Sequence, residues 1–164
     1  MVELTFYKVY WCAHHGHPAL ALNVAESDQC LVLALGTEDA MALAATHMPG
    51  PSSTSRTYGL LADVAIELGG QLTAVQLRIG TDAVVRSFLH LNGPRGSTIV
   101  PAYIVDGITL ALRQGLPLWM TEADFTTFSE MAAAHAPAPA HQGLEPYRSL
   151  VESLDLDGFG GMRH

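Results

Sequence analysis

The stretch Pro101-Ala-Tyr-Ile-Val-Asp-Gly-Ile-Thr-Leu-Ala-Leu-Arg-Gln-Gly-Leu-Pro-Leu-Trp-Met120 decides the fold that this sequence predicts. Its middle carries apolar residues at helical spacing, which predicts a helix with one apolar face. Asp106 falls in the first turn and Arg113 in the last, where the helix dipole favours these charges. Gly115 fits a left-handed helix stop and Pro117 prevents continuation. The apolar run that follows predicts a buried strand, so the whole stretch is expected to form strand, helix and strand.

The same stretch resembles the bifunctional nuclease (DUF151) family. The signature of that family is roughly Ala-Arg-Pro-Ser-Asp-Ala-Ile-Ala-Leu-Ala-Leu-Arg, followed by a Gly-x-Pro-Ile strand. Asp106 stands at the signature Asp, and the matching scaffold positions are Ile108, Leu110, Ala111, Leu112, Arg113, Gly115 and Pro117. The Arg and Ser of the signature are replaced by Tyr103 and Val105. The family's Thr-His-Asp-Leu helix start is replaced by Thr57-Tyr58-Gly59-Leu60.

The resemblance covers about residues 1–135. It implies an α+β fold with a mixed β-sheet of about six to seven strands and three or more packed helices, and it implies a homodimer. We therefore expect a bifunctional nuclease-like domain over residues 1–135. A Pro/Ala-rich linker and a short C-terminal helix or tail are expected over residues 136–164.

Strands are predicted over residues 2–11, 18–24, 30–35, 72–79, 84–92 and 97–103. The apolar run Cys30–Leu35 is typical of a strand that is buried on both faces. A helix is expected to open at 36–39 with an inner face of Ala40, Met41, Ala44, Ala45 and Met48. A second helix is expected with an apolar face of Leu60, Leu61, Val64, Ala65 and Leu68. Thr121–Asp124 resembles a capping box and predicts the start of a last helix.

The composition favours a globular chain that does not grip phosphates. The chain has 164 residues, enough for one domain with a core, and its formal net charge is −8. A nucleic-acid-binding surface is basic, whereas this sequence has one lysine and no basic cluster, so nucleic acid is disfavoured as a partner. Cys12 and Cys30 are expected to be buried free thiols. No stretch resembles a signal peptide or a membrane span, and we expect a cytoplasmic protein.

His14, His15 and His17 form a cluster that invites a metal hypothesis, because three imidazoles could bind a metal ion. Adjacent histidines in a turn point apart, however, and no carboxylate lies near them in the sequence. We therefore expect an exposed turn and no metal. The sequence has no phosphate loop, dinucleotide fingerprint or nucleophile elbow, so no cofactor is expected.

The candidate site follows from what the substitutions remove. The resemblance implies that the family's functional cluster consists of the signature Arg, Ser and Asp with the His and Asp of the second helix start. Here Asp106 and Thr57 remain, and the cation and the imidazole are gone. A carboxylate in an apolar setting tends to have a raised pKa and could act as a general acid or base on an uncharged substrate. The alternative is that Asp106 only stabilises its own helix.

The sequence thus predicts a degenerate family member repurposed as a small-molecule enzyme. Its reaction is expected to be a cyclisation or isomerisation of a hydrophobic, polyketide-like metabolite, with pocket shape holding the reactive conformer. Asp106, Tyr103 and Tyr58 are the expected catalytic residues, and Thr57, Val105, Met41 and Trp119 the expected substrate-binding residues. The alternatives are a nuclease acting on DNA or RNA, as in the family, and a non-catalytic binding or regulatory protein.

Overall fold

A computed structural model describes residues 1–13, 15–46 and 53–135. The chain divides into two units, Met1–Met131 and Ala132–His164, and the whole sheet belongs to the first unit. The predicted domain boundary after residue 135 stays a prediction. His14, Met48 and the C-terminal segment 136–164 lie outside the described residues.

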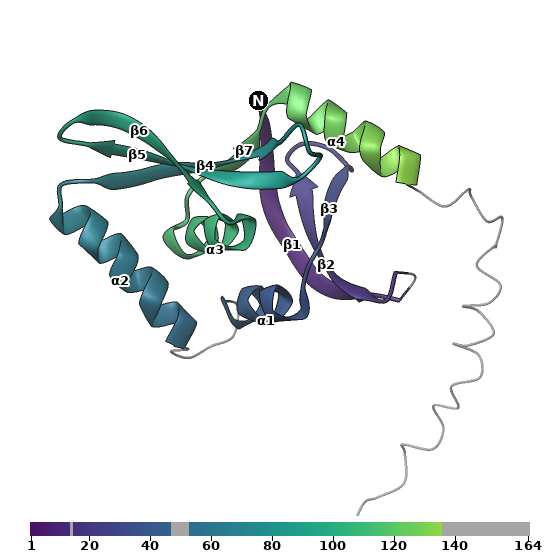
Figure 1. Cartoon of the computed structure of the whole chain (residues 1–164), viewed down its shortest axis with the longest axis horizontal. Helices are drawn as coiled ribbons and strands as arrows, with labels where there is room; N and C mark the ends of the chain where they lie inside the picture. The colour runs from purple at the N-terminus through teal and green to yellow at the C-terminus, as the bar shows by residue number, and fades with distance from the viewer. Residues whose placement is uncertain (14, 47–52, 136–164) are drawn as a thin grey trace, which may run out of the picture. The chain divides into compact units, whose positions relative to one another are not determined.

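The described chain forms a seven-stranded mixed sheet with four helices (Figure 1). The elements are β1 (Val2–Cys12), β2 (His17–Val24), β3 (Cys30–Ala34), α1 (Thr37–Thr46), α2 (Ser53–Glu67), β4 (Gln71–Ile79), β5 (Val85–Gly93), β6 (Gly96–Ala102), α3 (Ile104–Gln114), β7 (Leu118–Met120) and α4 (Glu122–His135). The strand order is β3-β2-β1-β7-β4-β5-β6. The predicted α+β fold with a mixed sheet is confirmed.

The short strand β7 joins the two halves of the sheet. It pairs antiparallel with β1 on one side and parallel with β4 on the other. All the other strand pairs are antiparallel neighbours. Among the described residues, no helix combines the length and the apolar character that crossing a bilayer needs.

Helix α3 forms as the sequence predicts and lies close to the sheet. It begins after Tyr103, which has an extended backbone, and ends at Gly115 with a φ of 61°. A side chain at Gly107 would place its Cβ 2.3 Å from the Ser87 Oγ of β5. The fully buried Ser87 hydroxyl lies within hydrogen-bond distance of the carbonyl oxygens of Ala102 (3.0 Å) and Tyr103 (2.9 Å). The absence of a side chain at Gly107 therefore allows the start of α3 to approach β5, and Ser87 fixes the backbone that leads into it.

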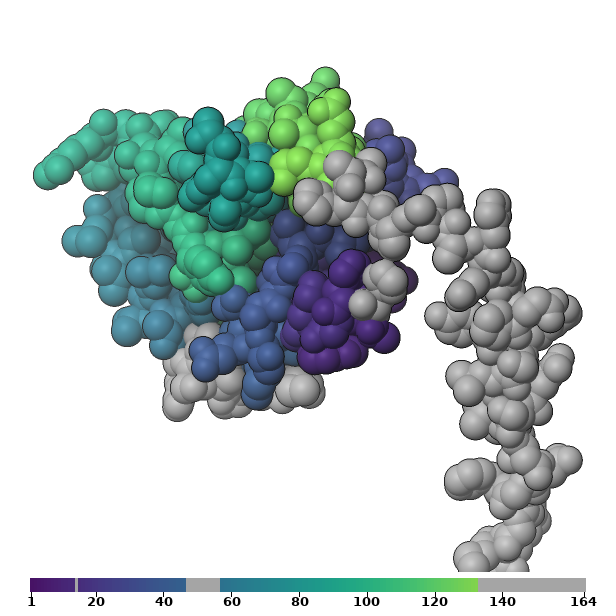
Figure 2. All heavy atoms as spheres, turned by 45° about the vertical axis from the view of Figure 1, so that its right-hand side comes forward, coloured from purple at the N-terminus to yellow at the C-terminus, as the bar shows by residue number. Residues whose placement is uncertain are grey.

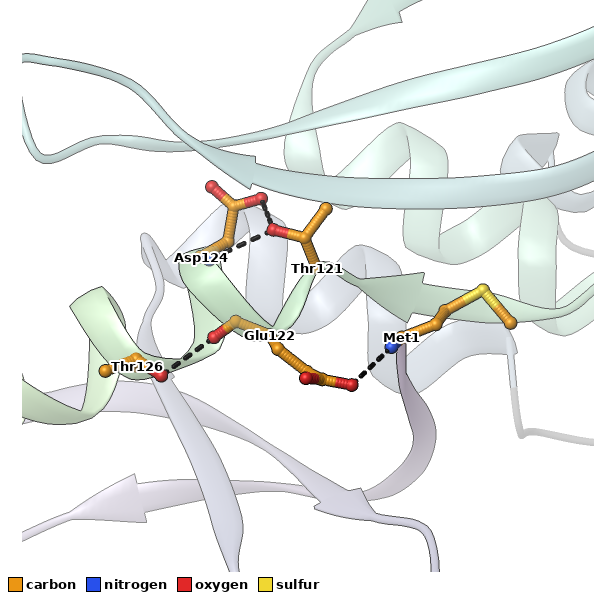
Figure 3. A network of polar contacts seen from close by, with 5 residues as sticks. All are labelled: Met1, Thr121, Glu122, Asp124 and Thr126. Atoms are coloured by element: carbon orange, nitrogen blue, oxygen red, sulfur yellow. Dashed lines mark hydrogen bonds and ion pairs between the residues drawn. The ribbon is translucent and has the colours of Figure 1, made fainter.

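Thr121 caps α4 as predicted (Figure 3), and the reciprocal bond of Asp124 goes to the Thr121 hydroxyl, where a capping box uses the backbone N–H. The Asp124 backbone N–H donates to the Thr121 Oγ1 at 3.0 Å, and the Thr121 hydroxyl donates to the Asp124 carboxylate at 2.5 Å. The second carboxylate oxygen of Asp124 accepts a bond from the Ile79 backbone N–H at 3.1 Å. Glu122, in the same turn, forms an ion pair of 2.8 Å with the amino group of Met1. The cap thus connects α4 to the end of β4.

Strand β3 differs from its prediction. Leu31 and Leu33 are buried, whereas Cys30 and Val32 are exposed, so the expected burial on both faces is wrong. The reason is position, because β3 is an edge strand and has a covered face and an open one. The prediction of two buried thiols is wrong as well, since Cys30 is exposed and Cys12 is partly exposed.

The inner faces of α1 and α2 also differ from their predictions. Helix α1 buries Ala40 and Leu43, and Met41 is exposed. Helix α2 buries Ala62, and the apolar residues around Leu60 and Leu68 are exposed instead. An apolar periodicity shows which residues share a helix face, but it does not show which element of the chain covers that face.

Candidate functional site

A pocket of about 490 Å³ lies where α2 and α3 meet the end of the β5–β6 hairpin. Its lining is formed by Thr57, Tyr58 and Leu61 of α2, Leu89 of β5, Ala102 of β6, and Asp106 and Leu110 of α3. The residues of this lining are mostly apolar, and Asp106 is the charged one among them. The sequence-predicted residues Asp106, Tyr58 and Thr57 therefore lie together in one pocket.

Tyr58 and Asp106 form the polar centre of this pocket. The Tyr58 hydroxyl donates to the Asp106 Oδ1 at 2.5 Å, although the two residues are 48 positions apart. Burial, with the hydrogen bond to Asp106 as the next cause, raises the pKa of Tyr58 to about 12. The phenol is therefore protonated at neutral pH and remains a hydrogen-bond donor. Asp106 lies in the first turn of α3 as predicted, and the hydrogen bond that its side chain makes in the described structure goes to Tyr58.

Arg113 is a cation that acts on Tyr58 from outside the described pocket lining. It lies in the last turn of α3, and its positive charge partly opposes the rise in the Tyr58 pKa. No basic side chain belongs to the described lining of the pocket itself. The pocket thus offers a hydrogen-bonded acid and carboxylate to a ligand, without a cation in contact.

Tyr103 lies elsewhere. Its side chain is 58% exposed, and its hydroxyl donates to the Asp39 Oδ2 of α1 at 2.8 Å. That hydrogen bond is the main cause that raises the pKa of Tyr103. Tyr103 lines a different cavity, of about 240 Å³, together with Val105 and Ile108. The predicted catalytic residue Tyr103 is absent from the lining of the pocket with Tyr58 and Asp106, because its hydroxyl is bonded to Asp39 of α1, although the charge of Asp106 also contributes to the raised pKa of Tyr103.

The structure separates the other predicted binding residues from the pocket. Val105 is 2% exposed and lies beside Tyr103's cavity. Met41 is on the exposed side of α1. Trp119 alternates with the buried Leu118 and Met120 along β7 and lies against His90, with ring centroids 5.6 Å apart. It therefore occupies the sheet face opposite the core that contains α3.

Sequence reasoning missed the apolar wall of the pocket and the partner of Tyr103. Leu110 follows Asp106 by four residues, so helical spacing could have placed it on the same face. Leu89 and Ala102 come from strands that are paired across the sheet, and no local pattern indicates their position. The position of Asp39 in the first turn of a predicted helix indicates a role in stabilising that helix, but nothing in the sequence connects Asp39 to Tyr103.

The described residues of the histidine turn make ring and sulfur contacts. The rings of His15 and His17 stack with centroids 5.6 Å apart, and the Cys12 Sγ lies 3.1 Å from the His15 Nδ1. Within residues 1–13, 15–46 and 53–135, no group of three or more His, Cys, Asp or Glu side chains is placed to hold a metal ion. The predicted metal-ligand candidate His14 lies outside the described residues.

The comparisons with known proteins agree with this architecture. The family model for the bifunctional nuclease domain matches residues 20–129, which is more than half of the chain. The chain therefore belongs to the bifunctional nuclease domain family. The matched range includes both tyrosine–aspartate pairs, Tyr58–Asp106 and Tyr103–Asp39. No curated protein shows significant similarity to the chain.

Proposed function

We propose that this member of the bifunctional nuclease domain family is a cofactor-independent enzyme that acts on an uncharged, hydrophobic small molecule. The observation that carries the proposal is the 2.5 Å hydrogen bond between Tyr58 and Asp106 at the centre of a mainly apolar pocket. Apolar walls with a few convergent polar groups are typical of small-molecule sites. The reaction class that fits is the cyclisation or isomerisation of a polyketide-like carbonyl compound.

The chemistry needs one base and one hydrogen-bond donor. Asp106 would remove a proton from the carbon beside a substrate carbonyl, and the electron pair would move onto the carbonyl oxygen. Tyr58, protonated because its pKa is about 12, would turn its single O–H from Asp106 to that oxygen when the substrate binds. Return of the proton to another carbon isomerises the substrate. Attack of the enolate carbon on a second carbonyl of the same chain closes a ring, and the alkoxide that forms there takes the proton back from Asp106.

The second candidate is nuclease activity, and the family match favours it. Phosphodiester cleavage needs cations or a metal to neutralise the charge that develops on phosphate. Arg113 lies near Tyr58 and is the side chain that could contribute, whereas the described pocket lining contains a carboxylate and no cation. We therefore place this candidate second. The cytoplasmic location is part of the first proposal and is supported by two cysteines that are free thiols.

A model substrate tests the proposed acid–base site. Deuterium uptake from D₂O by the α-carbons of 2-tetralone, followed by NMR, reports enolisation without knowledge of the natural substrate. The wild type is expected to accelerate uptake above the buffer rate, and Asp106→Asn is expected to return it to that rate. Asp63→Asn on the exposed side of α2 is the matched control and should behave as the wild type.

The same variants separate the two candidates. Purified wild type and Asp106→Asn are incubated with single- and double-stranded DNA and RNA, with and without Mg²⁺. No cleavage is expected from either protein. Cleavage by the wild type that Asp106→Asn abolishes, without enolisation of the model ketone, would establish the nuclease and overturn the first proposal.

A further inference from the structure

The turn between β1 and β2 brings a thiol and an imidazole together. The Cys12 Sγ lies 3.1 Å from the His15 Nδ1, within hydrogen-bond distance. A nucleophile in contact with a base is the arrangement that activates a cysteine for covalent chemistry, because the base can take up the thiol proton. Neither residue belongs to the described lining of the pocket with Tyr58 and Asp106, so the pair has no part in the acid–base site proposed above.

The backbone of the turn holds this pair in place. The Cys12 carbonyl oxygen accepts hydrogen bonds from the backbone N–H groups of His15 at 3.2 Å and of Gly16 at 2.8 Å. These two bonds fold the chain back on itself, so that His15 returns to the side chain of Cys12. Gly16 has a φ of 68°, a conformation that glycine adopts without steric cost. The contact between sulfur and nitrogen is therefore built into the turn.

His17 restrains the imidazole of His15 from the side. Cys12 and His17 are the last register pair of the β1–β2 ladder, and directly opposite residues project from the same face of a sheet. The rings of His15 and His17 stack with an interplanar angle of 24°. The His17 Nδ1 lies 3.0 Å from the Pro18 carbonyl oxygen, which can only accept, so Nδ1 carries a proton and this bond fixes the ring. Nucleophile, base and orienting group thus stand in contact order.

The second cysteine of the chain provides a comparison. Cys30 is exposed and Cys12 only partly exposed. The Cys30 Sγ lies 3.9 Å from the carbonyl oxygen of Leu31, and a carbonyl cannot take up the thiol proton at neutral pH. Access alone therefore predicts that Cys30 reacts faster with a reagent in solution, whereas proton transfer to His15 predicts that Cys12 does.

We propose that Cys12 is a nucleophilic site that adds to conjugated carbonyl compounds, with His15 as its base and His17 as the residue that positions His15. The thiol proton moves to the His15 Nδ1, and the sulfur electron pair forms a bond to the β-carbon of the electrophile. The electron pair of the carbon–carbon double bond moves toward the carbonyl oxygen. The enolate then takes the proton from the His15 imidazolium at its α-carbon. The thiol is added across the double bond, and no oxidant or reductant is needed.

The surroundings of Cys12 favour this class of electrophile. Sulfur is a soft nucleophile, and an addition has no leaving group to stabilise, so one imidazole serves both proton transfers. Tyr10 lies two residues before Cys12 and on the same face of β1, where its ring offers an apolar surface beside the thiol. His15 is exposed, and Figure 2 shows purple atoms of this N-terminal part of the chain at the surface of the molecule. A ligand can therefore reach the sulfur without opening the fold.

Competition between the two cysteines tests the proposal within one molecule. The full chain is treated with N-ethylmaleimide at pH 7, and the rate at each cysteine is followed by mass spectrometry of peptides. A free thiol is only a few per cent thiolate at pH 7, so proton transfer is expected to make Cys12 react about tenfold faster than Cys30. Equal rates, or a faster Cys30, overturn the proposal.

Substitution of the base and a change of pH separate proton transfer from access. His15→Gln keeps a side chain of similar reach that cannot take up a proton, so the Cys12 rate is expected to fall to that of Cys30, whose own rate should not change. In the wild type the advantage of Cys12 should shrink from pH 7 to pH 9, because an ordinary thiol ionises near pH 8.5. A folded His15→Gln that keeps the advantage, or an advantage that does not depend on pH, overturns the role of His15.

Two substitutions at His17 test whether it positions His15. His17→Phe keeps a ring for the stack and should keep most of the advantage of Cys12 at pH 7. His17→Ala removes the ring and should lower that advantage, with the Cys30 rate unchanged as the internal control. Circular dichroism and a melting curve show that each variant is folded. The same advantage in both variants overturns the positioning role of His17.

Discussion

Two tyrosine–aspartate pairs in this molecule are alike in chemistry and different in setting. In each pair a tyrosine hydroxyl donates to an aspartate in the first turn of a helix, Tyr58 to Asp106 of α3 and Tyr103 to Asp39 of α1. The first bond is 2.5 Å long and lies in the mainly apolar pocket. The second is 2.8 Å long and belongs to a tyrosine that is 58% exposed.

The difference shows what turns a polar pair into a candidate site. Burial is the first cause that raises the pKa of Tyr58 to about 12, whereas for Tyr103 the hydrogen bond to Asp39 comes first. Water competes with the exposed pair and screens its charge. The partly buried pair has an adjacent space for a ligand, and the contact with that ligand is stronger because the surroundings are less polar.

Displacement of α3 from β5 would break the Tyr58–Asp106 pair. Of the changes considered, it is expected to lower the free energy of unfolding the most. Gly107→Ala places a methyl group 2.3 Å from the Ser87 Oγ and 2.5 Å from its Cβ, so the start of α3 must move. Overpacking of this kind costs about 1–3 kcal/mol of unfolding free energy. Gly59→Ala in α2 is the control, because no atom lies within 4 Å of the new Cβ and alanine favours a helix. Chemical denaturation should show opposite signs for the two variants, and equal stability of both would contradict the packing argument.

Removal of the Tyr58 hydroxyl tests the buried pair directly. Tyr58→Phe keeps the aromatic wall and leaves Asp106 without the donor it has now. A hydrogen bond in this partly exposed position contributes about 1 kcal/mol to the free energy of unfolding. In a chain of this size that lowers the melting temperature by about 2–4 °C. An unchanged melting temperature would mean that water replaces the phenol at no cost.

The dependence of stability on pH above 10 should reveal the raised pKa of Tyr58 in the buried pair. The pKa of Tyr58 is about 12 in the folded protein against an ordinary value of 10.0. Stability from this group is therefore present below pH 10 and is lost as the pH rises toward 12. The denaturation midpoint of the wild type is expected to fall over this range, and that of Tyr58→Phe is expected to fall less. If the two proteins lose stability in parallel, the phenol is not held in its protonated form by the fold.

Removal of a hydroxyl from the exposed pair, Tyr103–Asp39, should change stability and activity the least. Tyr103→Phe removes a hydroxyl that lies largely in water, so the free energy of unfolding is expected to change by less than about 0.5 kcal/mol. The enolisation of 2-tetralone should also be unaffected, since Tyr103 lies outside the pocket with Asp106. A loss of that activity in Tyr103→Phe would return Tyr103 to the site.

The sequence predicted best where the information is local. Helix α3, its left-handed end at Gly115 and the cap at Thr121 are specified by residues within one or two turns, and the structure confirms them. The proximity of Tyr58 to Asp106 came from the family resemblance, because the two residues are 48 positions apart. That resemblance aligned Tyr103 with a signature residue as well, but alignment does not fix the direction of a side chain at a helix N-cap.

The exposure of the apolar residues Leu60, Val64 and Leu68 on α2 could not be predicted for a different reason. Their spacing is that of a buried face, and the pattern is the same whether the cover is the same chain or another one. Strand β3 shows the corresponding limit in a sheet, because an apolar run such as Cys30–Ala34 does not reveal that the strand is at an edge. Both errors concern which element or chain covers an apolar face, and a single sequence carries little information about that cover.

The position of β7 sets the order in which the sheet can be completed during synthesis on the ribosome. β1 and β4 are joined through β7, which begins at Leu118, so the two halves of the sheet emerge as separate three-stranded units. Until β7 leaves the exit tunnel, the inner edges of both units are unpaired and available to other nascent chains. A stalled chain that ends before Leu118 would therefore expose two unpaired strand edges. Chaperone contact should be greatest at the chain lengths for which β7 has not yet left the exit tunnel.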